Sequence, residues 1–404
     1  MKARGKFALA VLLFLSACAP VVKTAQPTQI SSSPVPADNP PFLENSMTPT
    51  LLPNESPPAR AESEFKTDFS KHIVPYNEIL SGGPPKDGIP ALKDPQFVSV
   101  SEAEEWLKPL EPVILVQVED EAKAYPIQIL IWHEIANDTV ADEALVVTFC
   151  PLCNTAIAFK RTDDGIVLDF GTTGRLRYSN LIMYDRQSET WWQQATGEAI
   201  AGELTGNQLE FYPATIISWQ DFKAAHPSGK VLSRDTGYPR DYGRNPYVGY
   251  DNVNNPPFLY DGPPTPNQLP PVARVLTIDL NGEAVAYPYE TLEKIGVVND
   301  IVGGEAIVVF WQAGTVSPLD SASTASGHDV GAAAAFSRQI NDQILTFTFE
   351  GGAIKDLETG STWNVLGLAT DGELAGTQLT AVISINHFWF SWAAFKPETK
   401  IYQP

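Results

Sequence analysis

The sequence predicts a mainly β fold of the α+β class, in which two repeated β-rich units with short helices form a pseudo-symmetric pair. Short apolar runs rich in β-branched residues recur along the chain, and such runs are typical of strands. The 404 residues include 28 glycines and 34 prolines, which favour turn-rich β structure over a helical bundle. In addition, one ordered series of short segments occurs twice.

The elements of the first unit can be placed in order. Strands are expected at residues 113–118, 145–149, 155–159, 166–170 and 181–184. A helix at 127–135 begins directly after Pro126, a residue that favours helix starts. A second helix at 218–225 has Ser218 as its cap. This series predicts a twisted antiparallel sheet or small barrel in each unit.

The repeat defines the domain boundaries. Residues 121–126 (EAKAYP) recur as 283–288 (EAVAYP), and residues 202–209 recur as 372–379. Near the end of each unit, Ser218-Trp219 matches Ser391-Trp392. Because the order is kept, we interpret the chain as a duplicated domain. Unit one covers residues 65–232, a connecting loop covers 233–272, and unit two, a degenerate copy, covers 273–404.

The N-terminus predicts export. Three of the first six residues are basic, and residues 7–14 form an apolar run too short to span a bilayer. The next residues, LSAC, resemble a bacterial lipobox, so residues 1–17 are expected to be a signal peptide and Cys18 the lipidated residue. Residues 18–64 contain ten prolines and are expected to be a disordered tether. The resulting prediction is a lipoprotein anchored to the extracytoplasmic face of the cell membrane.

The charge excludes some partners. There are 27 Lys and Arg against 48 Asp and Glu, so the formal charge is −21. A protein that binds nucleic acid needs a basic face, and so does one held on anionic lipid by charge. We therefore expect no nucleic-acid partner, and a membrane contact only through the N-terminal lipid. Protein partners are not indicated by the sequence and stay unknown.

The clearest difference between the units is Cys150-Pro-Leu-Cys153, which unit two replaces with residues 312–315 (QAGT) and a longer loop. Since Asn154 tolerates the left-handed backbone and a strand pattern follows, the segment is typical of a metal-binding knuckle in a hairpin. Together with His133 it could hold a soft ion, copper or zinc. Thiol–disulfide chemistry and a structural disulfide stay open as alternatives.

A second group of residues suggests ligand binding. Arginine is suited to bidentate capture of carboxylate or phosphate. Arginines occur with aromatic residues in three places: a unit-one segment that is shortened in unit two, the segment that follows it, and the connecting loop. The candidates are Arg175, Arg177, Tyr178, Arg186, Arg234, Arg244 and Tyr247. The loop can act as a lid or clamp over the unit-one site, or it can be a connection fixed to the surface by ion pairs.

These segments carry a resemblance to a known family. Residues 132–138 (WHEIAND), 147–153 (VTFCPLC), 183–186 (MYDR) and 232–247 resemble the bacterial and archaeal domain-of-unknown-function family three-one-seven-nine. The resemblance covers most of residues 100–400, although Asn154 stands where that family usually has glycine. It implies an exported, often lipidated protein with a shared Cys-Pro-Leu-Cys site, and it implies no catalytic activity.

Two functions follow from the sequence. The favoured one is a surface lipoprotein whose Cys150–Cys153 site binds a soft metal ion or exchanges thiols and disulfides. The alternative is a binding module without chemistry, which holds a small acid or surface glycan beside a passive disulfide. The sequence contains no P-loop, dinucleotide-binding glycine pattern, Gly-x-Ser-x-Gly elbow or His-Glu-x-x-His motif, so whether the protein is an enzyme stays open.

Overall fold

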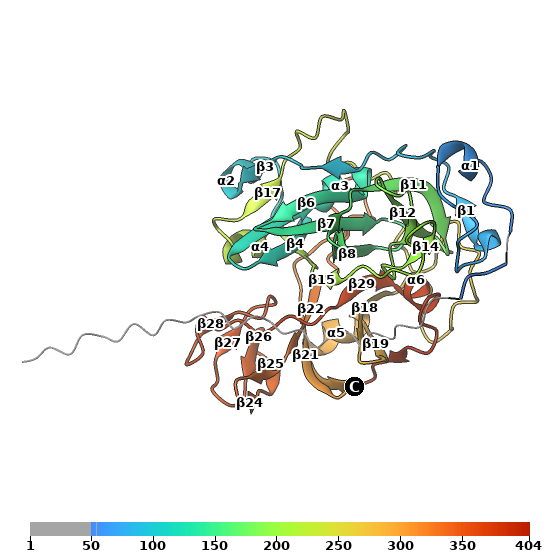
Figure 1. The fold of residues 1–404 in the computed structure, drawn as a ribbon. Helices are drawn as coiled ribbons and strands as arrows, with labels where there is room; N and C mark the ends of the chain where they lie inside the picture. Colours follow the sequence, from blue (N-terminus) through green and yellow to red (C-terminus); the bar gives the residue numbers. More distant parts are fainter. Residues whose placement is uncertain (1–49, 54) are drawn as a thin grey trace, which may run out of the picture. The chain divides into compact units, whose positions relative to one another are not determined.

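The computed structural model describes residues 50–53 and 55–404. Within these residues the chain is mainly β, with several sheets and few short helices, which confirms the predicted fold class. Figure 1 shows residues 79–232, here called the first half, and residues 274–401, here called the second half. The predicted signal peptide and Cys18 lie outside the described residues. The pseudo-symmetry of the two halves stays a prediction.

The first half contains three five-stranded sheets. The first has the order β1 (Ile79–Ser81), β11 (Phe170–Arg177), β12 (Asn180–Asp185), β13 (Trp191–Gln193) and β14 (Ala199–Ala201). The second has the order β15 (Phe211–Tyr212), β8 (Thr155–Lys160), β7 (Glu143–Cys150), β6 (Ile135–Val140) and β2 (Leu92–Lys93). The third has the order β16 (Thr215–Ser218), β4 (Pro112–Val118), β5 (Glu121–Pro126), β17 (Lys230–Leu232) and β3 (Phe97–Ser99). The short strands β9 (Thr162–Asp163) and β10 (Ile166–Val167) form a separate pair.

The second half uses smaller sheets. One has the order β29 (Ile385–Phe388), β18 (Arg274–Leu280), β19 (Glu283–Pro288) and β30 (Lys400–Ile401). Another has the order β20 (Val297–Val302), β21 (Glu305–Gln312) and β22 (Ala332–Ser337). The third has the order β25 (Phe347–Glu350), β26 (Ala353–Asp356), β27 (Thr362–Trp363) and β28 (Ala369–Asp371). The short strands β23 (Gln339–Ile340) and β24 (Gln343–Ile344) pair with each other.

The helices are short and mostly follow strands. They are α1 (Ala61–Glu64), α2 (Val100–Ala103), α3 (Ile127–His133), α4 (Trp219–Ala225), α5 (Tyr289–Ile295) and α6 (Trp389–Ala393), with a 3₁₀ turn at Tyr76–Glu78. Ser218 caps α4 as predicted, because its side chain accepts a hydrogen bond from the Asp221 amide. The helix predicted at 127–135 ends earlier, since Glu134 takes the left-handed conformation (φ 59°) and Ile135 begins β6.

The strand predicted at 166–170 is wrong in its middle. Strand β10 ends at Val167 and β11 begins at Phe170, so residues 168 and 169 are outside both strands. The apolar run continues because Leu168 and Phe170 are buried, although the backbone leaves one pairing for another. The apolar run therefore predicted burial correctly, but it did not predict where the strand pairing stops.

The folded part begins earlier than the sequence predicts. Residues 55–64 belong to the expected tether, yet Glu55 accepts a hydrogen bond from the Tyr76 amide (3.0 Å), and Ala61 is fully buried. Ala61 packs in one core cluster with Phe65 and Trp191. These contacts join residues far apart in the sequence, so the local proline-rich composition does not reveal them.

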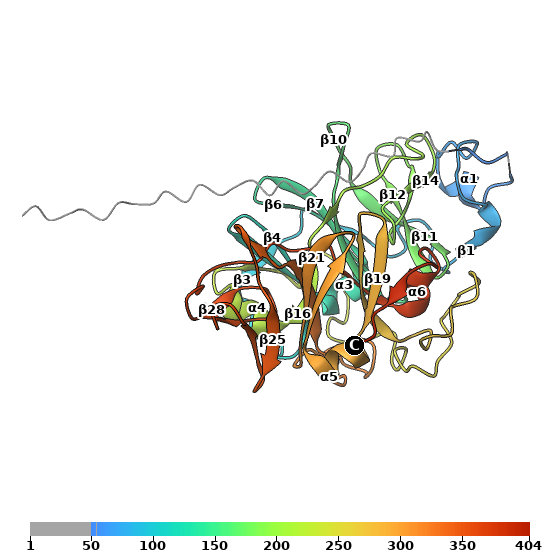
Figure 2. The ribbon, with the colours of Figure 1, turned by 90° about the horizontal axis from the view of Figure 1, so that it is seen from below.

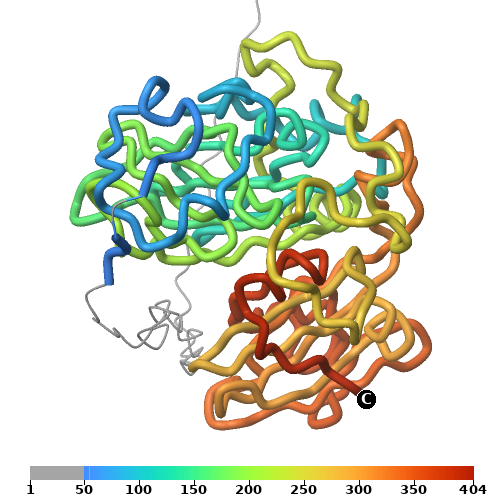
Figure 3. The backbone as a smooth tube through the Cα atoms, turned by 90° about the vertical axis from the view of Figure 1, so that its right-hand side faces the viewer, coloured from blue at the N-terminus to red at the C-terminus, as the bar shows by residue number. Residues whose placement is uncertain are grey.

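The two halves share a hydrophobic core. Trp219 and Phe222 of α4 pack in one cluster with Phe310, Phe347 and Trp363 of the second half. Strand β16 of the first half also contacts β22 of the second half, and Figure 2 shows the two halves from below. Figure 3 follows the connecting segment, residues 233–272 in yellow, from the first half to the second. The second half is therefore placed to contribute side chains to a site in the first.

Candidate functional site

The two cysteines lie in a tight hairpin turn. Strands β7 and β8 pair antiparallel up to Cys150 and Thr155, and residues 151–154 connect them. The Cys153 amide donates to the Cys150 carbonyl (3.2 Å), and Asn154 is left-handed with φ 51°, as predicted for a knuckle. Both cysteines are free thiols and both are buried, with Cys150 2% and Cys153 0% exposed. We call residues 150–154 the Cys turn.

Residues far along the chain surround the sulfur atoms. The Ser179 carbonyl oxygen lies 3.4 Å from Cys153 Sγ and 3.9 Å from Cys150 Sγ, and it accepts from the thiols. The Asn180 side-chain amide donates to Cys153 Sγ (3.4 Å). From the second half, the Phe388 amide donates to the Cys153 carbonyl (2.8 Å), and the Ser391 hydroxyl is among the groups that lower the pKa of Cys153. The sulfur site is thus completed by both halves of the chain.

This environment makes the two thiols unequal. Burial opposes charge on Cys153, yet hydrogen bonds from Cys150, Ser391 and Asn180 bring the pKa of Cys153 below its usual value. Burial raises the pKa of Cys150 well above its usual value, and the hydrogen bond and charge of Cys153 add to this. Because the thiolate is the nucleophilic form, Cys153 is the more reactive sulfur of the pair.

Glu134 is a candidate site residue that the sequence analysis did not single out. It follows α3 in the left-handed conformation, and its carbonyl accepts from the Phe149 amide (2.8 Å), next to Cys150. Burial raises the pKa of Glu134 to about 8. Within the described part of the chain, the Glu134 carboxyl has no hydrogen-bond partner. It is therefore a carboxyl group able to hold or release a proton near neutral pH beside the sulfur pair.

The second half shows what this position needs structurally. There the residue after α5 is Gly296, also at positive φ (71°), and its carbonyl accepts from the Trp311 amide (2.9 Å). Glycine is the usual residue at such a helix end, because other residues adopt this conformation at a cost. A buried glutamate in the same place indicates a role beyond the fold. Setting residues 134 and 296 side by side would have revealed it from the sequence.

His133 does not join the sulfur pair. One ring nitrogen contacts the Pro90 carbonyl (2.7 Å) and the other the Tyr242 hydroxyl (2.6 Å). In the residues that the structure describes, no group of three His, Cys, Asp or Glu ligand atoms within 4.8 Å of one another includes Cys150 or Cys153. The ligand set of Cys150, Cys153 and His133 is therefore not formed, because both His133 nitrogens already have partners. The residues present do not fit zinc, which needs four ligands.

A different histidine lies near the Cys turn. His387 of β29 is fully buried, and its Nδ1 contacts the Thr155 hydroxyl (3.0 Å). Burial lowers the pKa of His387 to about 3, so the ring is neutral. Its sequence position in the second half gave no sign of this contact, which depends on β29 lying against β8.

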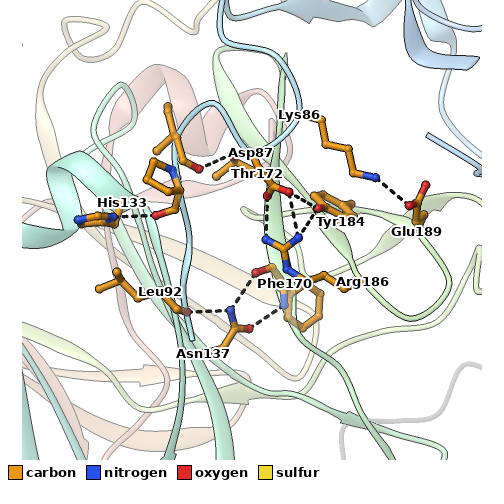
Figure 4. A network of polar contacts seen from close by, with 12 residues as sticks. Lys86, Asp87, Leu92, His133, Asn137, Phe170, Thr172, Tyr184, Arg186 and Glu189 are labelled. Carbon is orange, nitrogen blue, oxygen red and sulfur yellow. Dashed lines mark hydrogen bonds and ion pairs between the residues drawn. The ribbon is translucent and has the colours of Figure 1, made fainter. Parts of the chain in front are cut away.

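Three of the predicted ligand-binding arginines are used by the fold. Arg175 pairs with Glu64 (3.0 Å), Arg177 with Glu78 (2.8 Å) and Arg186 with Asp87 (2.8 Å). All three carboxylates come from the N-terminal segment, residues 55–90, which these pairs hold against β11 and β12. Figure 4 shows the Arg186 pair, with Tyr184 donating to Asp87 (2.6 Å). Tyr178 stacks on Arg177 and is buried. These residues therefore fix the segment and are not free to bind a small acid.

The connecting-loop candidates separate into two groups. Arg234 donates to Gln128 (2.8 Å) and stacks on Trp106, whereas Arg244 is exposed and its backbone bridges to Ser323. Tyr247 is half-buried against the cluster that contains both sulfur atoms. Of the predicted lid residues, Tyr247 is thus the one that reaches the Cys turn.

One other group could hold a metal ion by geometry. Ligand atoms of Asp251, Asp320 and His328 lie within 4.8 Å of one another. However, Asp251 already pairs with Arg274 (2.8 Å), and His328 pairs with Asp320 (3.1 Å). The group is accounted for as an ion-pair cluster that joins the connecting segment to the second half.

Fold and site together define a mainly β protein with a buried, asymmetric dithiol in a hairpin turn. The profile of the family described as Protein of unknown function (DUF3179) matches residues 86–399, so the chain belongs to that family. Comparisons with curated proteins and with solved structures find no significant match. Among the described residues, no helix has the length and apolar character needed to cross a membrane.

Proposed function

We propose that this is an exported, lipid-anchored protein of the extracytoplasmic face whose Cys150–Cys153 pair exchanges thiols with disulfides. The anchor is inferred from the basic, apolar and LSAC segments that end at Cys18. The observation that supports the exchange is the set of hydrogen bonds from Cys150, Ser391 and Asn180 to Cys153, which favour its thiolate in a buried site. The substrate class is a disulfide, either of a small molecule or of a protein.

The reaction would take place in two steps. The Cys153 thiolate attacks one sulfur of the substrate disulfide, a mixed disulfide forms, and the second substrate sulfur leaves as a thiolate that takes a proton from solvent. Cys150 then gives its proton to Glu134 and attacks Cys153, which releases the first substrate sulfur as a thiolate. The substrate gains two electrons and becomes two thiols, while the Cys150–Cys153 pair is oxidised to a disulfide.

A redox titration tests the proposal. The full chain carrying Cys18→Ser would be equilibrated with mixtures of reduced and oxidised dithiothreitol, and its free thiols counted by alkylation under denaturing conditions. We expect a single two-electron transition in which two alkylated thiols are lost together. If both thiols remain free at every ratio, the exchange function is wrong.

Soft-metal binding is a second candidate. Two buried sulfur atoms without a third ligand suit a two-coordinate Cu(I) ion, which prefers thiolates. Elemental analysis of the same protein, purified without oxygen and without a His tag, separates the two functions. One copper per chain that is absent from the Cys150→Ser, Cys153→Ser variant would favour metal binding. No metal together with a reversible disulfide would favour exchange.

A further inference from the structure

We infer that residues 252–259 form a lid over the dithiol and that Ser179 couples this lid to the oxidation state of Cys150 and Cys153. The inference rests on the proposed exchange function and adds its regulation. It starts from the burial of both sulfur atoms. No substrate can reach the sulfur of a cysteine residue that is 0–2% exposed unless part of its cover moves away.

The cover comes from the connecting segment. Tyr247, Tyr250 and Leu259 pack against the cluster that contains both cysteines. Gly249 and Tyr250 are anchored through their amides to Asp320 (2.6 Å) and Leu319 (3.1 Å). The segment therefore has a fixed base at residues 247–251, and residues 252–259 extend from it.

The lid itself is held by the packing of Leu259 and by one side-chain hydrogen bond from outside the connecting segment. The Ser179 hydroxyl donates to the Phe258 carbonyl (2.6 Å). In the described chain, the other hydrogen bonds of residues 252–259 remain within residues 249–258, such as that from the Phe258 amide to the Tyr250 hydroxyl (3.2 Å). The Phe258 side chain is 55% exposed, so packing adds little there. Ser179 is thus the latch of the lid.

The same residue contacts the thiols. While its hydroxyl holds the lid, its carbonyl oxygen accepts from Cys153 (3.4 Å) and Cys150 (3.9 Å). Ser179 is fully buried, so its carbonyl depends on these donors. One buried residue therefore connects the two sulfur atoms to the lid.

The backbone around Ser179 is poised to move. Tyr178 and Ser179 form the two-residue turn between β11 and β12, with φ values of 55° and 66°. Such a turn favours Asn-Gly, and other residues hold this conformation only when their surroundings enforce it. Here the enforcing contacts are the stacking of Tyr178 on Arg177 and the hydrogen bonds of Ser179.

Oxidation removes part of this enforcement. When the pair gives two electrons to a substrate disulfide, its protons pass to Glu134 and solvent, neither sulfur keeps an S–H, and the buried Ser179 carbonyl loses these partners. A buried acceptor without a partner is unfavourable. The turn then relaxes, Ser179 releases Phe258, and the lid opens in the oxidised state.

Hydrogen exchange measured by mass spectrometry tests the coupling. The full chain with Cys18→Ser would be compared in excess reduced dithiothreitol and after oxidation by diamide. We expect amide exchange of residues 252–259 to be about tenfold faster in the oxidised state, with little change at residues 247–251. Equal exchange in both states would overturn the coupling.

Ser179→Ala tests the latch independently of redox chemistry. Removing the hydroxyl should speed exchange at residues 252–259 and speed alkylation of the reduced thiols, because the lid opens without oxidation. Ser321→Ala is the matched control, since Ser321 also donates to a loop carbonyl (Ser323, 3.0 Å). If Ser179→Ala behaves like Ser321→Ala, the latch is wrong. If diamide forms no disulfide but Ser179→Ala opens the lid, the exchange function fails and the lid stands.

Discussion

The β7–β8 hairpin of the first half and the β21–β22 hairpin of the second have the same register but different turns. Cys150 pairs with Thr155 across four residues, whereas Gln312 pairs with Ala332 across the loop 313–331. The four-residue turn contains Cys153, and Cys150 is the last residue of the strand before it. The longer loop packs on the connecting segment, for example through the Asn245 amide, which donates to Ala322 (2.9 Å).

The hydrogen bonds around the two hairpins match closely, and we call the residues that form them, Asp185, Trp192 and Asn137 with their counterparts Asp356, Trp363 and Asn299, the frame. Trp192 Nε1 donates to Asp185, and Trp363 Nε1 donates to Asp356, both at 2.9 Å. The amide of Asn137 donates to the Phe170 carbonyl (2.8 Å), and that of Asn299 to the Phe347 carbonyl (2.7 Å). The comparison teaches that both halves keep the same frame, while the groups of the proposed chemistry are confined to the Cys turn and to Glu134 beside it.

The largest expected effect concerns the two sulfur atoms. In the Cys18→Ser background, Cys150→Ser keeps the sulfur that Ser391 and Asn180 hydrogen bond, whereas Cys153→Ser leaves the thiol whose pKa burial raises. We expect iodoacetamide to alkylate the Cys150→Ser protein at least about tenfold faster at pH 7, because a pKa higher by one unit lowers the thiolate fraction about tenfold. Equal rates, measured by mass spectrometry, would show that the asymmetry of the turn is absent.

Substitutions in the frame should lower the free energy of unfolding and leave the reactivity of the thiols unchanged. Trp192→Phe and Trp363→Phe each remove one hydrogen bond from a buried aspartate, so each should lower the free energy of unfolding by about 1–3 kcal/mol. Urea unfolding followed by circular dichroism measures this. The comparison breaks if one substitution is costly and its counterpart is neutral. As a control, the thiol alkylation rate of Trp363→Phe should equal that of the protein without this substitution.

Glu134 should make the free energy of unfolding depend on pH, whereas its counterpart Gly296 has no group that titrates. Burial raises the pKa of Glu134 from 4.5 to about 8, so between these values the folded state holds a proton that the unfolded state has lost. This contribution to stability therefore falls as pH rises from about 4.5 to 8, by up to about 1.4 kcal/mol per pH unit. Glu134→Gln should flatten that slope in urea unfolding across this range. An unchanged slope would mean that Glu134 titrates normally.

The smallest effect is expected at Asn154, which has no counterpart in the longer loop 313–331. Its φ of 51° suits glycine, so Asn154→Gly should change the free energy of unfolding by less than about 1 kcal/mol. Asn154→Ala should cost about 1–2 kcal/mol, because alanine is strained in the left-handed region. Thermal unfolding of the two variants measures the difference, and a more stable alanine variant would contradict the assigned turn.

The sequence predicted the local features of the site well. The strands on either side of the Cys turn, the left-handed Asn154 and the cap at Ser218 all follow from short segments, and all were confirmed. The partners of the sulfur atoms were missed because they come from long-range packing. Ser179 reaches the turn from the connection between β11 and β12, Asn180 from the start of β12, and Ser391 from the other half.

One error shows why Ser391 was missed. Sequence likeness aligns Ser218-Trp219 with Ser391-Trp392. The hydrogen-bond pattern instead makes Trp389 the structural equivalent of Trp219. The Trp219 amide donates to Glu111, and the Trp389 amide donates to Ala273, both at 2.8 Å at the start of the helix. The likeness is therefore shifted by three residues. Ser391 lies inside α6 and does not cap it, which leaves its hydroxyl available to Cys153.

The composite cover of the sulfur atoms has a consequence for the order of synthesis. Cys150 and Cys153 are made early, but their cover includes Tyr250 and, near the end of the chain, Phe388 and Ser391. A chain that emerges from its N-terminus therefore exposes both thiols until almost all of it has been made and folded. During that interval any oxidant in the surroundings can act on them. The thiols of the folding chain are thus open to oxidation until β29 and α6 have packed against the first half.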